Sequence, residues 1–330
     1  MRFSLRLNND LRIDDYVALA RAAERAGFDQ FWISNDLFFR SAPVLLAAVA
    51  HATERIEIGT CVLNPHTMHP AELAMLAATM DELTGGRFNL GLAAGAADFL
   101  GWVGLEDRRP VATMREAIAA IRAWLAGERA VAGRFVRDVD AAYLRFGPSR
   151  ATPIYLGAMG PAMLRLAGEL ADGTLPLLFP PEHYFTVRAL IDEGRRRRVP
   201  GLGDLDLAAC VWVSLGDDAR AARRALAEKI AYYGHALSPL ILERLGLTRD
   251  DFAPIERAVM VERDLGRAGA MVDERMLQIG VAGAPEALVA RLRPLVDAGV
   301  QHLSFGPPLG PDPLRAVELL GREVLPSLGR

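Results

Sequence analysis

The stretch ALARAAERAGFDQFWI, residues 18–33, places an amphipathic helix, a glycine and a short apolar strand in direct succession. Gly27 stands where the helix would end, and glycine readily adopts the left-handed conformation that commonly terminates helices. Two later segments repeat this order: Leu164–Gly173 leads into Thr174–Leu178, and Leu288–Gly299 leads into Val300–Phe305. We therefore expect each segment to be a helix that feeds a buried strand.

Other apolar runs predict the remaining strands, with helical segments between most of them. These runs are Phe3–Leu7, Arg55–Leu63, Phe88–Ala93, Pro153–Gly157 and Leu207–Ser214. Strands that alternate with helices form parallel sheets. Eight such units, with no G-x-G-x-x-G after the first strand, favour an α/β protein with a closed (β/α)8 TIM barrel over an open dinucleotide-binding sheet.

The chain length of 330 residues fits two domains of ~150 residues or one barrel with insertions. No Gly/Ser-rich linker divides the chain, so we expect a single domain over residues 1–330. Strand–helix alternation is interrupted at Phe99–Val111 and Asp217–Gln278. We interpret both segments as insertions on the C-terminal face of the barrel, where barrel enzymes build their sites.

Composition excludes several classes of protein. Hydrophobic residues make up 51% of the chain and charged residues 24%, which is typical of a globular fold and excludes disorder. The run Pro43–Ala50 is too short to span a bilayer, and residues 1–10 lack a secretory signal, so we expect a cytoplasmic protein without membrane contact. A net charge of −3 offers no basic surface for nucleic acid, so a small-molecule partner is favoured.

Cysteine and lysine restrict the chemistry further. Cys61 and Cys210 lie in separate hydrophobic runs, and in a cytoplasmic chain we favour two buried thiols over a disulfide. Lys229 is the only lysine, and the run Asp217–Ala231 around it predicts a surface helix. Schiff-base and pyridoxal enzymes need a lysine amine in a pocket, because arginine keeps its proton. We therefore expect neither chemistry.

Polar residues follow the strand that ends at Ile33, in the order Ser34, Asn35, Asp36. At the mouth of a barrel Asp36 could donate or accept a proton if burial raises its pKa. Ser, Asn and Asp also favour turns and helix caps, and the sequence leaves both interpretations open.

Small residues end three other predicted strands. Gly59 permits close backbone approach ahead of Cys61, and Gly91, Ala93, Ala94 and Gly95 could form the floor of a ligand cavity. Gly157, Ala158, Met159 and Gly160 lead into a helix that starts at Pro161, where free N–H groups could bind a phosphate or simply form a turn.

Two clusters of basic or imidazole side chains give weaker signals. His66 and His69 lack a third ligand, so we expect no metal. Arg195–Arg198 end another helix, where positive charge complements the helix dipole, and we favour a solvated helix end over an anion site.

Together these segments resemble the bacterial luciferase-like superfamily, and within it the branch that uses the deazaflavin coenzyme F420, methylenetetrahydromethanopterin reductases in particular. The resembling stretches are Thr53–Gly59, Asn64–Pro65, Asp81–Arg87, Pro110–Ile118, Pro153–Gly173 and Val281–Gly310. The resemblance implies a TIM barrel with F420 in its C-terminal mouth. It implies a ring near Asn35, Asp36, Cys61, Val62 and Asn64, with Gly91–Gly95 beside it. It implies a phosphate at Ala158, Met159, Gly160 and Pro161, with Gly157 also in the cofactor site. It also implies a non-prolyl cis peptide at Cys61–Val62.

The chain departs from the family pattern at several positions. Asn35-Asp36 stands where many members have Asp-His, and Ala96 stands where they have an acid. The reductases have a glutamate where Arg6 stands, which argues against a pterin substrate. The family's sugar-phosphate dehydrogenases use several lysines for the substrate phosphate, and Lys229 alone does not replace them.

From the resemblance we expect hydride transfer from reduced deazaflavin to an activated C=C or C=N bond, with Asp36 as proton donor. One alternative is a monooxygenase that uses reduced FMN and oxygen. A second is a cofactor-binding protein without catalysis. Related barrels pair through outer helices, so we also expect a homodimer through the helices that span Val44–Ala50 and Leu73–Met80.

Overall fold

The computed structural model describes residues 1–234, 237 and 239–329, and in this part of the chain it contains a closed parallel barrel. Eight strands form the barrel in the order β1-β2-β3-β4-β5-β6-β7-β9, and β9 pairs with both β7 and β1. A ninth strand, β8, adds to the end of β7. The strands are β1 (Arg2–Leu7), β2 (Gln30–Ile33), β3 (Glu57–Thr60), β4 (Phe88–Leu92), β5 (Ile154–Leu156), β6 (Gly173–Thr174), β7 (Asp206–Leu215), β8 (Val281–Gly283) and β9 (His302–Leu309).

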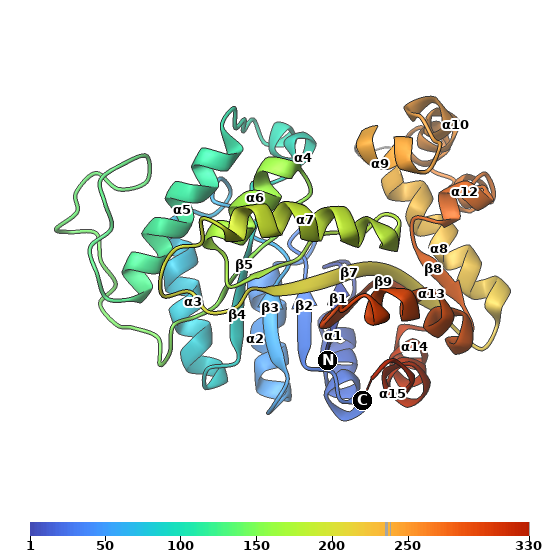
Figure 1. Cartoon of the computed structure of the whole chain (residues 1–330), viewed down its shortest axis with the longest axis horizontal. Coiled ribbons are helices and arrows are strands. Elements are labelled where there is room, and N and C mark those ends of the chain that lie inside the picture. The colour runs from blue at the N-terminus through green and yellow to red at the C-terminus, as the bar shows by residue number, and fades with distance from the viewer. Residues whose placement is uncertain (235–236, 238, 330) are drawn as a thin grey trace.

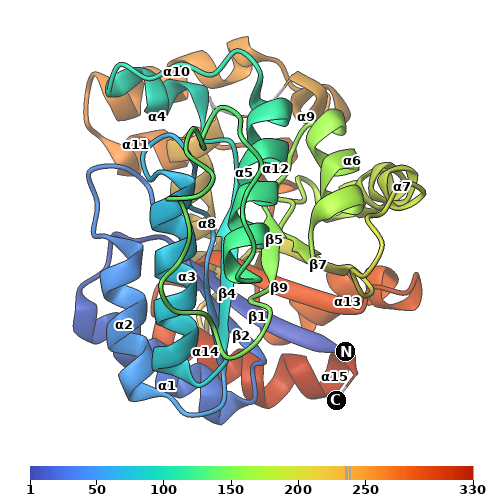
Figure 2. The ribbon, with the colours of Figure 1, turned by 90° about the vertical axis from the view of Figure 1, so that its left-hand side faces the viewer.

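Helices surround this barrel, and Figure 2 shows α1, α2, α3 and α5 around its outside. They are α1 (Ile13–Ala26), α2 (Ala42–Ala52), α3 (Pro70–Thr84), α4 (Ala97–Trp102), α5 (Pro110–Leu125), α6 (Pro161–Leu170), α7 (Tyr184–Arg195), α8 (Ala219–Tyr233), α9 (Pro239–Arg244), α10 (Arg249–Met260), α11 (Leu265–Ala270), α12 (Glu274–Leu277), α13 (Pro285–Asp297), α14 (Pro313–Leu319) and α15 (Leu325–Leu328). None of the described helices is both long and apolar enough to cross a membrane.

The predicted barrel is confirmed, with corrections to its strands. Strand β8 was not predicted, the expected strand Arg55–Leu63 is shorter, and Thr174–Leu178 contributes only its first residue to β6 and an isolated bridge at Leu177. Gly27 has the expected positive φ of 85° and caps α1. Gly173 instead lies inside β6, where an added Cβ would collide with the Tyr155 ring. Its role is close packing, so the predicted helix-ending conformation was wrong there.

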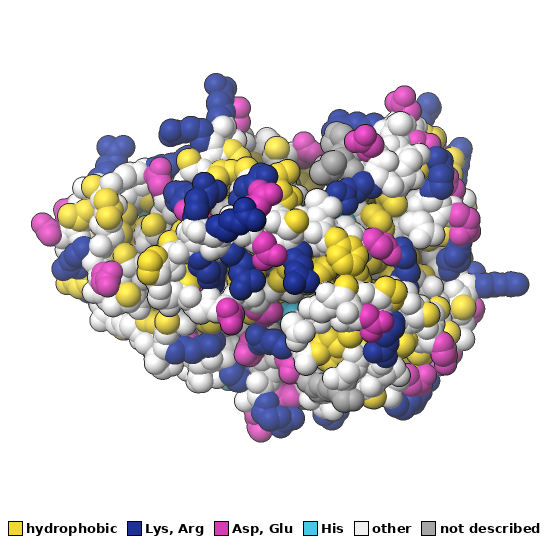
Figure 3. All heavy atoms as spheres, viewed as in Figure 1, with side chains coloured by type: hydrophobic (Ala, Val, Ile, Leu, Met, Phe, Trp, Pro, Cys, Tyr) yellow, Lys and Arg dark blue, Asp and Glu magenta, His cyan; other side chains and the backbone are white. Residues whose placement is uncertain are grey.

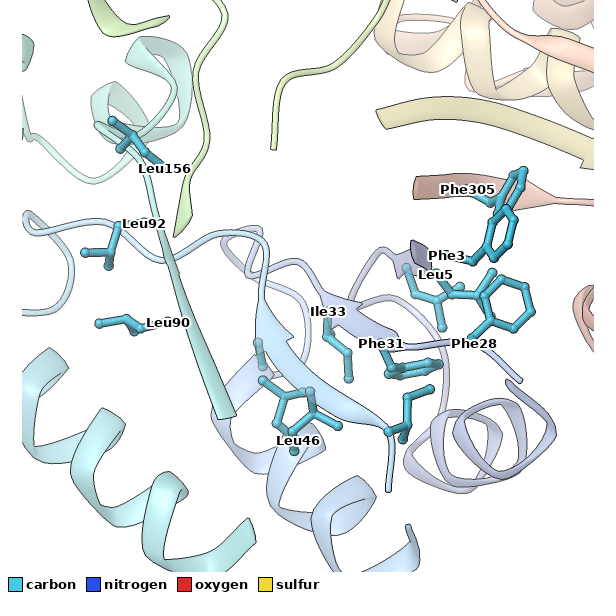
Figure 4. Close-up of a cluster of buried hydrophobic side chains, with 14 of the residues drawn as sticks. Phe3, Leu5, Phe28, Phe31, Ile33, Leu46, Leu90, Leu92, Leu156 and Phe305 are labelled. Carbon is cyan, nitrogen blue, oxygen red and sulfur yellow. The ribbon is translucent and has the colours of Figure 1, made fainter. Parts of the chain in front are cut away.

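Successive side chains along β1 point alternately outward, to the hydrophobic layer, and inward, to the barrel interior. Phe3 and Leu5 pack outward against a cluster that includes Phe305 (Figure 4). The neighbouring residues Ser4 and Arg6 therefore face the interior. At the N-terminal end of the barrel, Ser4 contacts the fully buried His302, whose other ring nitrogen lies 2.9 Å from Asp206.

This polar network seals the N-terminal end of the barrel. Asp206 also accepts hydrogen bonds from Tyr155 at 2.8 Å and from Arg2 at 3.0 Å. Burial alone would raise the pKa of Asp206, but His302 and Arg2 hold that pKa below its ordinary value. Because their hydrogen bonds are formed within this network, these polar groups hold the barrel closed at the end opposite the loops that follow the strands.

In Figure 1 α4 of the first insertion lies at the top, and α8, α9, α10 and α12 of the second insertion lie on the right. The second insertion has its own apolar cluster, which packs against Phe179 and Trp212 of the barrel. Residues 235, 236 and 238 of this predicted insertion lie outside the described residues. An irregular segment between α5 and β5 was not predicted.

Figure 3 shows basic and acidic side chains intermixed on one face, with Lys and Arg side chains grouped over α6 and α7. Arg195 pairs with Asp192 at 3.5 Å, and Arg198 donates to the carbonyl oxygens of Gly168, Ala171 and Gly203. These arginines fix the end of α7, which agrees with the helix-end interpretation of Arg195–Arg198.

Candidate functional site

A cavity of about 570 Å³ opens at the C-terminal ends of the barrel strands. Its walls come from the loops after the strands and from both insertions, through Phe99 and Leu100 of α4 and Lys229 and Tyr233 of α8. Most of the predicted site residues line it: Asn35, Asp36, Cys61, Val62, Asn64, Ala93, Ala94, Gly95, Gly157, Ala158, Met159 and Gly160. Gly91 and Pro161 do not. Gly91 is buried where β4 passes Thr60, and Pro161 begins α6.

The position of Asp36 is fixed by Asn9, a buried residue that the sequence analysis did not identify. The Asn9 amide nitrogen donates to the Asp36 carbonyl oxygen at 3.0 Å, and the Asn9 amide oxygen accepts from the Asp36 N–H at 3.2 Å. The carboxylate of Asp36 lies 3.4 Å from the Tyr233 hydroxyl. Burial raises the pKa of Asp36, although the nearby charge of Lys229 and the hydroxyl of Tyr233 act in the opposite direction.

Lys229 corrects the prediction of a surface lysine. The helix was predicted correctly, but its lysine lines the cavity, with the ammonium 3.8 Å from the Tyr233 ring centroid and 5.2 Å from that of Trp212. Burial lowers the pKa of Lys229 to about 7, although Asp10 and Asp36 act to raise it. Schiff-base and pyridoxal chemistry were excluded because Lys229 was expected at the surface, and that premise was wrong.

Among the cavity residues to which the sequence analysis gave no role are Arg6, Trp212 and Tyr233. Trp212 and Tyr233 come from β7 and α8, and Arg6, noted only as a departure, comes from the first strand. The alternation of Phe3 and Leu5 could have placed Arg6 inside the barrel. Tyr233 stands four residues after Lys229, on the same side of α8, and this spacing was the available signal.

Small side chains form one wall of the cavity. Ala93, Ala94 and Gly95 follow β4, while Gly157 and Ala158 follow β5, and an added Cβ at Gly157 would lie 3.1 Å from a Val62 methyl. The peptide Cys61–Val62 is cis, as the resemblance implied. This wall leaves room for a flat ring.

The N-terminus of α6 adjoins this wall. Gly160 is the N-cap, Pro161 is the first helical residue, and an added Cβ at Gly160 would meet open space. The first N–H groups of a helix have no partner within it, and together with the helix dipole they favour an anion. The predicted phosphate position is therefore chemically suited to one.

The side chains of Asn35 and Asn64, both predicted to contact the coenzyme, form hydrogen bonds with nearby backbone groups. The Asn35 amide oxygen accepts from the N–H of Ala42 at the start of α2, and that of Asn64 accepts from the N–H groups of His66 and Thr67, each at 3.0 Å. Both residues line the cavity while they stabilise turns. Their amide nitrogens are the groups left for a ligand.

The structure shows the burial of the two cysteines and the contacts of His66 and His69. Cys61 and Cys210 are free thiols, as favoured, with Cys210 buried and Cys61 half-buried, and burial raises the pKa of Cys61 to about 12. His66 lies 3.1 Å from Asp107, whereas His69 caps α3. Among the described residues no group of three or more His, Cys, Asp or Glu could hold a metal.

Comparison with known proteins assigns the family. A family model described as luciferase-like monooxygenase matches residues 1–302. The chain belongs to the luciferase-like monooxygenase family. This confirms the resemblance stated from the sequence.

Similar proteins match the chain over almost its whole length. A 5,10-methylenetetrahydromethanopterin reductase of Archaeoglobus fulgidus is 31% identical over 99% of this chain and 100% of its own length. An F420-dependent glucose-6-phosphate dehydrogenase of Nakamurella multipartita is 31% identical over 94% of this chain and 91% of its own length. The structure of the coenzyme F420 dependent tetrahydromethanopterin reductase of Methanopyrus kandleri superimposes with a TM-score of 0.90, at 29% identity and 99% coverage of both chains.

Proposed function

We propose that this chain is a coenzyme F420-dependent oxidoreductase that transfers a hydride between the deazaflavin ring and an unsaturated C=C or C=N bond of a small molecule. The observation that carries the proposal is the end-to-end similarity to a reductase, 31% identical over 99% of this chain, together with the TM-score of 0.90 to an F420-dependent reductase. The F420-dependent dehydrogenase at 31% identity supports the same cofactor class.

The residues of the cavity fit such a coenzyme. The volume of about 570 Å³ lies within the range of ~300–1,000 Å³ typical of sites that enclose a small organic ligand. The wall of Ala93–Gly95 and Gly157–Ala158 can accept a flat ring, and the start of α6 can accept its phosphate. Cys61 and Val62 also line the cavity, and Val62 lies against Gly157 of this wall.

When bound, the coenzyme supplies the hydride, and the chain's own residues supply position and a proton. The apolar walls exclude water and hold the reacting groups together, which can lower a barrier by ~7–11 kcal/mol. Asp36, whose pKa is raised by burial, holds a proton at higher pH than an exposed carboxyl group does. Asn9 and Tyr233 keep the Asp36 carboxyl group at the cavity wall, where it can protonate the substrate.

A binding titration with oxidised F420 and with FMN in parallel, followed by fluorescence quenching, tests the cofactor assignment. We expect tight binding of F420 and weak binding of FMN. The opposite preference would contradict the proposal and favour an oxygen-using monooxygenase. F420 binding with no turnover across a broad panel of unsaturated acceptors would favour the non-catalytic alternative.

A further inference from the structure

The cavity contains a buried cation that the proposed hydride transfer does not use. Arg6 is only 6% exposed and lines the cavity. Its Nε donates to Ser304 Oγ at 3.0 Å, and its Nη2 lies 3.4 Å from the Val211 carbonyl oxygen. Within residues 1–234, 237 and 239–329, Nη1 has no hydrogen-bond acceptor and the guanidinium forms no ion pair with Asp or Glu.

The surroundings hold this guanidinium in place. An added Cβ at Gly306 of β9 would lie 2.5 Å from Arg6 Nη2, so the glycine leaves the space that the guanidinium fills. Ser304 and Val211 fix two of its donors from neighbouring strands. Nη1 is not a fully enclosed atom, and Arg6 lines the cavity, so a ligand in the cavity can approach the guanidinium.

A buried charge without an ionic partner is costly in a protein that has no ligand for it. The same cavity contains one further cation, Lys229, and among the described lining residues one carboxylate, Asp36. The walls therefore contribute one net positive charge, that of Arg6, whether Asp36 and Lys229 are both ionised or both neutral. This charge balance matches a monoanion better than a phosphate dianion.

We infer that the substrate is an unsaturated compound with a carboxylate, and that this carboxylate binds Arg6. The planar fork of a guanidinium matches the two oxygens of a carboxylate, whereas an ammonium acts as a point charge. Arg6 is thus a specificity-determining residue, because the charges of Lys229 and Asp36 offset each other. The inference names the substrate class of the proposed F420-dependent reaction and rests on that function.

Pairs of neutral and anionic ligands test this inference. Crotonate, sorbate and cinnamate are each compared with the corresponding amide, and dissociation constants are measured by tryptophan fluorescence, with and without F420. We expect at least one carboxylate to bind the wild-type protein at least tenfold more tightly than its amide. Equal binding of all acids and amides would overturn the inference.

Variants of Arg6 test whether this residue causes the preference for the acid over the amide. Arg6→Gln should remove the preference for the acid, while the affinity for F420 changes less than twofold. Arg224→Gln, an exposed arginine on α8, is the matched control and should retain the preference. Arg6→Lys keeps the charge and bulk if the glutamine variant does not fold, and it should reduce the preference at least threefold.

The outcomes separate this inference from the proposed function. An acid preference that is unchanged in a folded Arg6 variant would overturn the role of Arg6. F420 binding without any acid preference would refute the inference alone. Absence of F420 binding in the wild-type protein would refute the proposed function, whatever the ligand pairs show.

Discussion

Burial controls the charges of Asp36 and Lys229 more strongly than their attraction for each other does. Burial raises the pKa of Asp36 and lowers that of Lys229 to about 7, and each shift favours the neutral form. An exposed ion pair would show the opposite directions, since each charge would then stabilise the other. The apolar walls of the cavity and the rings of Trp212 and Tyr233 explain this result.

Asp36→Asn should lower turnover by ~10²–10⁴-fold, the usual contribution of a positioned acid, because asparagine cannot donate a carboxyl proton. Its affinity for F420 should change less than twofold. Single-turnover kinetics with an active acceptor and a parallel cofactor titration measure the two effects. Asp10→Asn removes an exposed carboxylate close by that does not line the cavity, and it serves as the control. Full activity of Asp36→Asn would remove this residue from the mechanism.

The single lysine permits a direct titration of one buried amine. Protein labelled with ¹³Cε-lysine should give one side-chain resonance, with a midpoint near pH 7 for Lys229. Asp36→Asn should move this midpoint to lower pH, because the Asp36 charge acts to raise the pKa of Lys229. A midpoint near the ordinary lysine value, ~10.4, would show that the ammonium is solvated.

At the scale of elements, local patterns predicted the barrel, but the direction of side chains depended on distant contacts. The helix, glycine and strand order of residues 18–33 is a local signal, and it predicted α1 and β2 closely. The helix α8 was likewise predicted from its own residues. Its buried stripe includes Leu226 and Ile230, and Lys229 stands at the edge of that stripe. Only the packing of Trp212 against this edge turns it into a cavity wall.

The sequence predicted the loops of the candidate site but not all of its separate side chains. The small-residue loops after β4 and β5 could be recognised because each is a continuous stretch of sequence. Asn9, Trp212 and Tyr233 come from separate elements, and their contacts with Asp36 or Lys229 exist only after the barrel closes. Such non-local contacts have no signature in a single sequence.

If the start of α6 binds the coenzyme phosphate, a negative charge added there should weaken F420 binding. Gly160→Asp is sterically open, and aspartate is a favourable N-cap, so the helix should remain stable. The added negative charge should weaken F420 binding at least tenfold by repelling the phosphate. Gly160→Asn, a neutral side chain of the same shape, is the control and should bind F420 within about threefold of wild type. Equal affinities of the two variants would place the phosphate elsewhere.

At the scale of the whole molecule, the two ends of the barrel have different roles. The N-terminal end is closed by the hydrogen-bonded network of Arg2, Asp206 and His302. The C-terminal end is open, and its cavity takes side chains from both insertions. This arrangement separates residues that maintain the barrel from residues that can vary with the ligand.

The outer surface of α2 and α3 gives a prediction about assembly. These neighbouring helices expose Val44 at 59% and Met75 at 45%, large apolar side chains that a symmetric contact would cover. We expect a homodimer in solution, and the double variant Val44→Asp with Met75→Asp should be monomeric, because burying two carboxylates at such a contact is unfavourable. Sedimentation equilibrium measures the mass. Val131→Asp changes an 88% exposed residue outside α2 and α3 and should remain dimeric. A double variant that stays dimeric would place the contact on another face, whereas a monomeric wild-type protein would mean that each barrel completes its cavity alone.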